Sequence, residues 1–110
     1  MNVAILGAGN VATHLSKSLI KAGFPIKQIW SRDHNHAVDL ALQIGANSIE
    51  NIKELSKNLD VIFIAVADDA IENVANQIPI GLNQILIVHT SGSTPLSVLN
   101  NISTQIGVLY

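Results

Sequence analysis

The chain has 110 residues, of which 48% are hydrophobic and 13% charged, and its formal net charge is −2. This length fits one domain with one hydrophobic core, and so small a charged fraction excludes a disordered or coiled-coil chain. The six Lys and Arg residues are scattered and form no basic stripe, which argues against DNA or RNA as a partner. The chain has no Cys, as suits a reducing cytoplasmic location, and its longest apolar run, residues 61–67, is far shorter than the roughly 20 residues that span a membrane. We therefore expect a cytoplasmic domain with neither nucleic acid nor membrane as a partner.

Short apolar runs alternate with helical patterns along the chain. Periodicity predicts, in chain order, a strand at 2–6, a helix at 10–22, a strand at 26–30, a helix at 37–44, a strand at 47–49, a short helix at 52–55, a strand at 61–66, a helix at 71–78, a strand at 85–88, a helix at 94–102 and a strand at 106–110. Gly23 and Gly45 are placed to end the first two helices, and Thr94 and Pro95 to begin the last. The run at 61–66 is apolar at every position, which is typical of a central parallel strand. The alternation predicts an α/β fold, a doubly wound parallel sheet with helices on both faces.

A glycine-rich turn, Gly-Ala-Gly-Asn-Val-Ala at residues 7–12, joins the first predicted strand to the first predicted helix. Gly7 permits a tight turn, Gly9 lets the backbone approach a pyrophosphate without an intervening Cβ, and Ala12 replaces a third glycine where helix and strand touch. The helix N-terminus offers free N–H groups and the positive end of its dipole to an anion. The turn has no lysine, which argues against a triphosphate-binding P-loop. The remaining alternative is an ordinary strand-to-helix turn.

The end of the second predicted strand carries a guanidinium where NAD-binding domains carry a carboxylate. An acidic residue about 20 positions beyond the glycines binds the ribose 2′-hydroxyl of NAD. This chain has Ser31 there, followed by Arg32, its one arginine. A guanidinium can hold a 2′-phosphate through two hydrogen bonds, so this pair favours NADP over NAD. The alternative is that Arg32 is a solvated loop residue that Asp33 neutralises.

Two further polar segments follow predicted strands, at the sheet edge where ligands of α/β domains bind. Asp69 is expected to cap the helix that begins near residue 71, whereas Asp68 could contact a ribose or a substrate. The polar cluster from His89 to Ser93 is expected to face the nicotinamide half of the coenzyme, with His89 and Ser91 as the candidates for contact with ligand. Turn chemistry explains Gly92, Ser93 and Thr94 without any function. The other histidines have no metal-ligand spacing with a carboxylate, so no metal site is expected.

Four segments together, residues 7–12, 30–32, 64–71 and 88–93, resemble bacterial NADP-dependent oxidoreductases of the phosphogluconate-dehydrogenase-like and pyrroline-5-carboxylate-reductase-like superfamily. The resemblance covers the whole chain. It implies an NADP-binding domain over residues 1–110 with a Rossmann-type sheet, strand order 3-2-1-4-5-6, whose last strand is truncated. A helical C-terminal domain, which in such proteins closes the substrate cleft and forms a homodimer, is expected to be missing from this chain.

The resemblance also implies where the coenzyme binds. Carried over by position, the contacts are Gly7, Gly9, Asn10, Val11, Ser31, Arg32, Val66 and Ser91. Asp68 and His89 complete the candidate set from the strand ends. Ala67 departs from the pattern, since relatives often have proline at this position, and we expect a less stiff loop there.

These features predict the NADP(H)-binding domain of an oxidoreductase that transfers hydride to or from a small carbonyl or imine-type substrate. No residue is assigned a catalytic role, and these 110 residues are expected to bind coenzyme with little or no turnover. One alternative is a non-catalytic nucleotide-sensing or regulatory module, because fold alone does not determine function. Another is a domain for NAD, a flavin dinucleotide or S-adenosylmethionine, which Ser31 and Arg32 disfavour.

Overall fold

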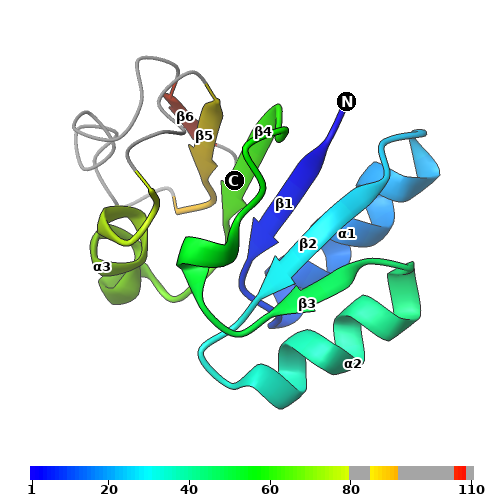
Figure 1. The fold of residues 1–110 in the computed structure, drawn as a ribbon, viewed down its shortest axis with the longest axis horizontal. Helices are drawn as coiled ribbons and strands as arrows, with labels where there is room; N and C mark the ends of the chain where they lie inside the picture. Colours follow the sequence, from blue (N-terminus) through cyan, green and yellow to red (C-terminus); the bar gives the residue numbers. More distant parts are fainter. Residues whose placement is uncertain (80–84, 92–105, 109–110) are drawn as a thin grey trace.

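The computed structural model describes residues 1–79, 85–91 and 106–108, which form a parallel sheet with helices on both faces (Figure 1). The sheet has six strands in the order β3-β2-β1-β4-β5-β6, which confirms the expected Rossmann topology. The strands are β1 (Val3–Leu6), β2 (Ile26–Trp30), β3 (Asn47–Ile49), β4 (Val61–Ile64), β5 (Leu86–His89) and β6 (Ile106–Val108). The helices are α1 (Asn10–Lys21), α2 (His34–Ile44) and α3 (Ile71–Asn76), with single 3₁₀ turns η1 (Ile52–Glu54) and η2 (Asp68–Ala70).

Apolar side chains cover the sheet on both faces. On one face Ile5 and Ile29 of the sheet pack with Leu40 and other residues of α1 and α2. On the other face Ile62 packs with Ile71 and other residues of η1 and α3. Burial of each such side chain contributes about 1.5–3 kcal/mol to folding. The two layers explain why β4 is apolar at every position, as expected for a central strand.

The strands end at the same level along one edge of the sheet. Leu6 of β1 lies in register with Trp30 of β2 and Ile64 of β4, and Ile64 lies in register with His89 of β5. The segments that leave these four strands therefore start side by side. The order of the strands reverses between β1 and β4, and ligands of open α/β sheets bind in the crevice at such a switch point.

Some predicted boundaries differ from the structure. The expectation that Asp69 caps the third helix is wrong, because the chain enters α3 through η2 and the residue at the N-cap of α3 is Ala70. The Ala70 N–H donates to Ala67 O at 2.9 Å, which places Asp69 inside the 3₁₀ turn. The fourth strand ends at residue 64 instead of 66, and α2 begins three residues before the predicted start. The helix predicted at residues 94–102 lies outside the described residues.

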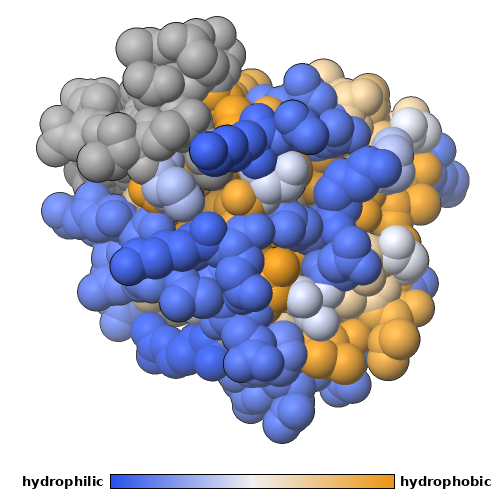
Figure 2. Space-filling model, viewed as in Figure 1, coloured by the Kyte–Doolittle hydropathy of each residue, from blue (hydrophilic) through white to orange (hydrophobic). Residues whose placement is uncertain are grey.

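The face of the molecule drawn in Figure 2 is mostly hydrophilic, with smaller apolar areas between the polar ones. Among the described residues, the exposed large hydrophobic side chains are Met1, Val11, Ile20, Phe24 and Leu42. No described helix is both long enough and apolar enough to cross a membrane.

Candidate functional site

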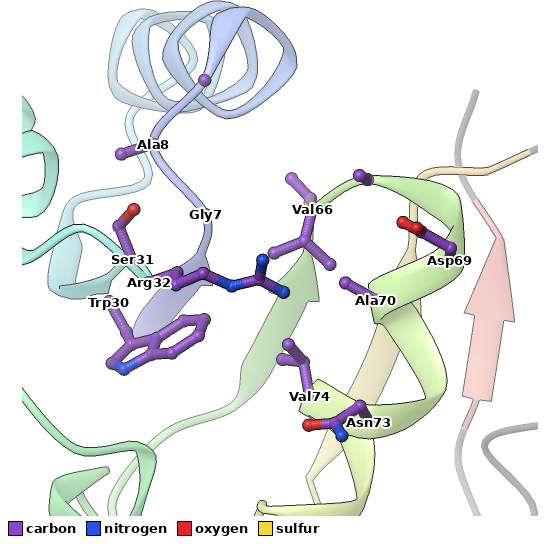
Figure 3. A pocket seen from close by; sticks show the side chains of 13 residues that line it. Gly7, Ala8, Trp30, Ser31, Arg32, Val66, Asp69, Ala70, Asn73 and Val74 are labelled. Atoms are coloured by element: carbon purple, nitrogen blue, oxygen red, sulfur yellow. The ribbon is translucent and has the colours of Figure 1, made fainter.

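A cleft of about 480 Å³ opens at the sheet edge where β1, β2 and β4 end (Figure 3). We call it the edge cleft. Three segments meet in it: the glycine turn after β1, the end of β2 with the two residues beyond it, and the loop from β4 into α3. Its lining consists of Gly7, Ala8, Gly9, Trp30, Ser31, Arg32, Ala65, Val66, Ala67, Asp69, Ala70, Asn73 and Val74. The cleft lies at the switch point between β1 and β4.

Gly7 lines the edge cleft directly after β1. Its φ is +131°, a conformation essentially restricted to glycine, and its N–H donates to Trp30 O at 2.6 Å. A Cβ at this position would overlap the carbonyl group of Ala65. Glycine is therefore required here for contact between the β1 turn and the end of β4, before any ligand is considered.

Gly9 lies at the N-terminus of α1 and leaves the space in front of the helix open. It is the N-cap residue with φ −80°, it makes no side-chain cap, and the first turn of α1 contains no acidic residue. A Cβ at Gly9 would meet nothing within 4 Å. The Thr13 N–H and hydroxyl donate to Gly9 O at 2.9 and 2.8 Å, which fixes the orientation of the turn. The result is an unobstructed helix N-terminus, which favours an anion.

Arg32 provides the positive charge on the opposite side of the cleft. Figure 3 shows its side chain extending from the end of β2 toward Val66 and Ala70. The side chain is exposed, and among the described residues the guanidinium has neither an ion pair nor a hydrogen bond. Its five donors are thus available to a ligand.

Asp33 does not neutralise this arginine. Its side chain caps α2, accepting the Asn35 N–H at 3.0 Å, and its other oxygen lies 3.7 Å from Nε2 of His36. An N-cap Asp of this kind is worth about 1 kcal/mol to the protein. The adjacent carboxylate therefore caps α2, and Arg32 forms no ion pair within the described part of the chain.

The remaining walls of the cleft were not predicted from the sequence. Trp30 lies beside Arg32, and its indole Nε1–H donates to Glu50 O at 3.2 Å, which holds the ring in place. Val74, together with Ala70 one turn earlier, forms an apolar wall on α3, while Asn73 beside them accepts a hydrogen bond from Gln77 Nε2 at 2.8 Å. The helical spacing of the α3 residues was visible in the sequence, but it indicated only that one face of the helix packs.

The structure brings together five of the ten predicted site residues: Gly7, Gly9, Ser31, Arg32 and Val66 all line the edge cleft. The other five do not line it. Asn10 and Val11 are exposed in the first turn of α1, Asp68 is exposed in η2, and His89 and Ser91 are buried at the end of β5. Contact of each residue with a coenzyme stays a prediction.

Within the described part of the chain no three His, Asp or Glu side chains gather in a way that could hold a metal ion. The chemistry available at the edge cleft is that of backbone amides, one guanidinium, hydroxyl and amide groups, the carboxylate of Asp69 and an apolar wall. This donor set matches a phosphorylated nucleotide, in which phosphates need N–H donors and the base needs an apolar surface.

The family model for "NADP oxidoreductase coenzyme F420-dependent" matches residues 2–92. The chain belongs to this family. The match includes the glycine turn, Arg32 and the β4–α3 loop, the three parts of the edge cleft. No curated protein matches the chain.

Several solved structures share the fold of this chain. A protein described as an NADP oxidoreductase from Bacteroides fragilis is 28% identical with a TM-score of 0.80, over 97% of this chain and 42% of that one. An imine reductase from a Pseudomonas species is 24% identical with a TM-score of 0.71, over 92% and 35% of the two chains. A reductive aminase from Aspergillus terreus, solved with NADPH4, is 19% identical with a TM-score of 0.77, over 96% and 39%. The chain spans less than half of the length of each of these proteins.

Proposed function

We propose that this chain is the NADP(H)-binding domain of an oxidoreductase that transfers hydride to or from a small carbonyl or imine-type substrate. One observation carries the proposal: the edge cleft has an open helix N-terminus on one side, and on the other an arginine that is unpaired among the residues that the structure describes. A dinucleotide phosphate needs these two anion sites at once, one for its pyrophosphate and one for its 2′-phosphate.

The residues of the cleft can be matched to the parts of the coenzyme. The amides of Gly9, Asn10 and Val11 would hold the pyrophosphate at the start of α1. Ser31 and Arg32 would hold the 2′-phosphate with charge-assisted hydrogen bonds. The adenine ring would pack against the apolar wall formed by Val66 and the nearby α3 residues.

The second half of the coenzyme would extend across β4 and β5. The adenosine half belongs at the end of β2, and the pyrophosphate at the switch point, so the nicotinamide continues toward β5. Asp68 and Ser91 follow β4 and β5 respectively and are proposed to lie near it. His89 is fully buried, and its role is considered below.

When bound, NADP(H) supplies the hydride chemistry, and the task of the chain is to bind and orient the ring. Hydride transfer from a nicotinamide needs an electrophilic C=O or C=N carbon, which is the reason for the proposed substrate class. A second candidate is hydride exchange between NADP and coenzyme F420, which the description of the family favours. Both candidates require the same NADP site.

The proposed activity also requires a part that the longer relatives have beyond the region matched here. The relatives are more than twice as long as this chain. We propose that a helical C-terminal domain completes the substrate cleft and forms a homodimer in the longer protein. The acid or base of the reaction would come from that part.

Titration calorimetry of the chain with NADPH, NADH and S-adenosylmethionine tests the proposal. We expect NADPH to bind more tightly than NADH by roughly 10- to 150-fold, as one lost charge-assisted contact predicts, and S-adenosylmethionine not to bind. Equal affinity for NADPH and NADH would show that Arg32 does not bind the 2′-phosphate. Absence of binding by either nucleotide would contradict the proposed function.

A further inference from the structure

His89 is a buried polar residue that the proposed coenzyme contacts do not explain. It is the last residue of β5, its exposed fraction is 0%, and it does not line the edge cleft. It lies in register with Ile64 of β4 on one side and with Val108 of β6 on the other. The imidazole is therefore separated from the edge cleft in this structure.

Within the described ranges the imidazole has one hydrogen-bonding partner, the backbone of the loop that follows β5. The Ser91 N–H donates to Nδ1 of His89 at 3.1 Å. Because Nδ1 accepts this bond, the ring proton lies on Nε2. Nε2 is buried and, among the described residues, has no hydrogen-bond partner.

Stability alone does not account for this arrangement. Within residues 1–79, 85–91 and 106–108 the buried Nε2–H donor has no acceptor, which is unfavourable, and a leucine in the same place would bury apolar surface without that cost. A buried polar residue that departs from the usual composition of a protein core is often kept because a function requires that residue. The interaction through which His89 can serve such a function is the hydrogen bond that its Nδ1 accepts from the Ser91 N–H.

A second set of bonds holds the same loop from the side. The Thr90 N–H donates to Ile64 O at 3.2 Å, and the Thr90 hydroxyl lies 3.4 Å from the same oxygen. The segment from His89 to Ser91 is thus tied to the end of β4 and to the imidazole beneath it. Its backbone has a defined position at the sheet edge, on the β5 side of the switch point.

We propose that His89 is a positioning residue for the nicotinamide half of the coenzyme. It fixes the Ser91 backbone, and through it the surface on which the nicotinamide half binds, without touching the coenzyme. This inference rests on the proposed function, since it assigns a role within the same NADP site. It predicts that the two halves of the coenzyme respond differently to loss of the imidazole.

Two variants of His89 separate this role from a general structural one. His89→Leu removes the acceptor and replaces the imidazole by an apolar side chain of similar size. His89→Asn keeps an acceptor, because an Asn side chain accepts the N–H two residues later in an Asx turn. Ser91→Pro removes the donor of the same bond and leaves His89 in place. Circular dichroism and thermal melts identify the variants that fold.

Each folded variant is titrated with NADPH and with adenosine 2′,5′-bisphosphate, which has the adenosine half and no nicotinamide. We expect His89→Leu and Ser91→Pro to weaken NADPH binding by roughly 3- to 10-fold, as loss of one hydrogen bond predicts, with bisphosphate binding unchanged. The emission spectrum of bound NADPH, which reports the surroundings of its nicotinamide, should shift in these variants and not in His89→Asn.

The outcomes distinguish the two proposals. Wild-type affinity for NADPH in His89→Leu, or an equal loss for both ligands, overturns the role of His89 and leaves the NADP site intact. A wild-type chain that binds neither ligand contradicts the proposed function itself, and the role of His89 with it.

Discussion

Gly7 and Ala65 are in direct backbone contact where β1 and β4 end, and this contact sets the shape of the edge cleft. Gly7 has φ +131°, and any Cβ there would overlap the Ala65 carbonyl. The β1 turn and the β4 end can approach only because this position lacks a side chain. The first glycine of the turn is thus part of the fold, whereas the second, Gly9, faces open space.

Gly7→Ala is therefore expected to destabilise the protein. Backbone strain at this φ and the overlap with Ala65 together predict a loss of about 3 kcal/mol in the free energy of unfolding, measured by urea denaturation. Gly45→Ala is the matched control, because Gly45 also has a positive φ, +73°, but open space around it. The control should lose only about 1 kcal/mol. Equal losses of unfolding free energy in the two variants would show that the overlap of the added Cβ with Ala65 does not contribute to the destabilisation.

Gly9→Ala is expected to leave stability nearly unchanged and to weaken coenzyme binding. The backbone of Gly9 suits any residue, and its Cβ would meet nothing within 4 Å. The gain in chain entropy and the poorer N-cap nearly cancel, so the free energy of unfolding should change by less than about 1 kcal/mol. The added methyl would occupy the space proposed for the pyrophosphate, and calorimetry should show NADPH binding about tenfold weaker or worse. Wild-type affinity would place the pyrophosphate elsewhere.

Arg32→Gln is expected to abolish the preference for NADPH. Arg32 has no ion pair or hydrogen bond within residues 1–79, 85–91 and 106–108, so its loss should leave the melting temperature unchanged. NADPH affinity should fall roughly 10- to 150-fold while NADH affinity stays the same. Lys27→Gln, at the other end of β2, makes the same change in charge and controls for long-range attraction. A similar fall in both variants would indicate that net charge alone attracts the coenzyme.

Asp33 is expected to stabilise the fold as the N-cap of α2 and, through its negative charge, to weaken binding of the 2′-phosphate. Asp33→Ala removes the N-cap of α2 and should lower the free energy of unfolding by about 1 kcal/mol. Asp33→Asn keeps a good N-cap and removes the negative charge beside Arg32, so stability should hold while NADPH affinity rises by roughly two- to fivefold. The rise should shrink at high salt, since the screening of exposed charges grows with ionic strength. A loss of NADPH affinity in Asp33→Asn would mean that the carboxylate itself contributes to binding.

Local patterns in the sequence determined much of the fold and part of the site. The strands at residues 26–30 and 47–49 and the end of α2 at Gly45 were predicted with the bounds that the structure has. Strand composition and helix caps depend on neighbouring residues, so a single sequence contains them. The glycine turn and Arg32 were predictable for a related reason: the carboxyl ends of parallel strands meet at one edge, wherever the helices pack.

The tertiary structure decided what depends on contacts between distant segments. Trp30 and Val74 belong to the cleft because β2 and α3 come together there, and no local pattern encodes their separation. Asp33 proved to be a cap and not a partner of Arg32, since the choice between these acceptor roles depends on the path of the chain into α2. His89 is buried at the end of β5 and accepts the Ser91 N–H, because the sheet continues through its position. Sequence periodicity determines which segments form strands and helices, but only packing determines which polar side chains are left facing solvent.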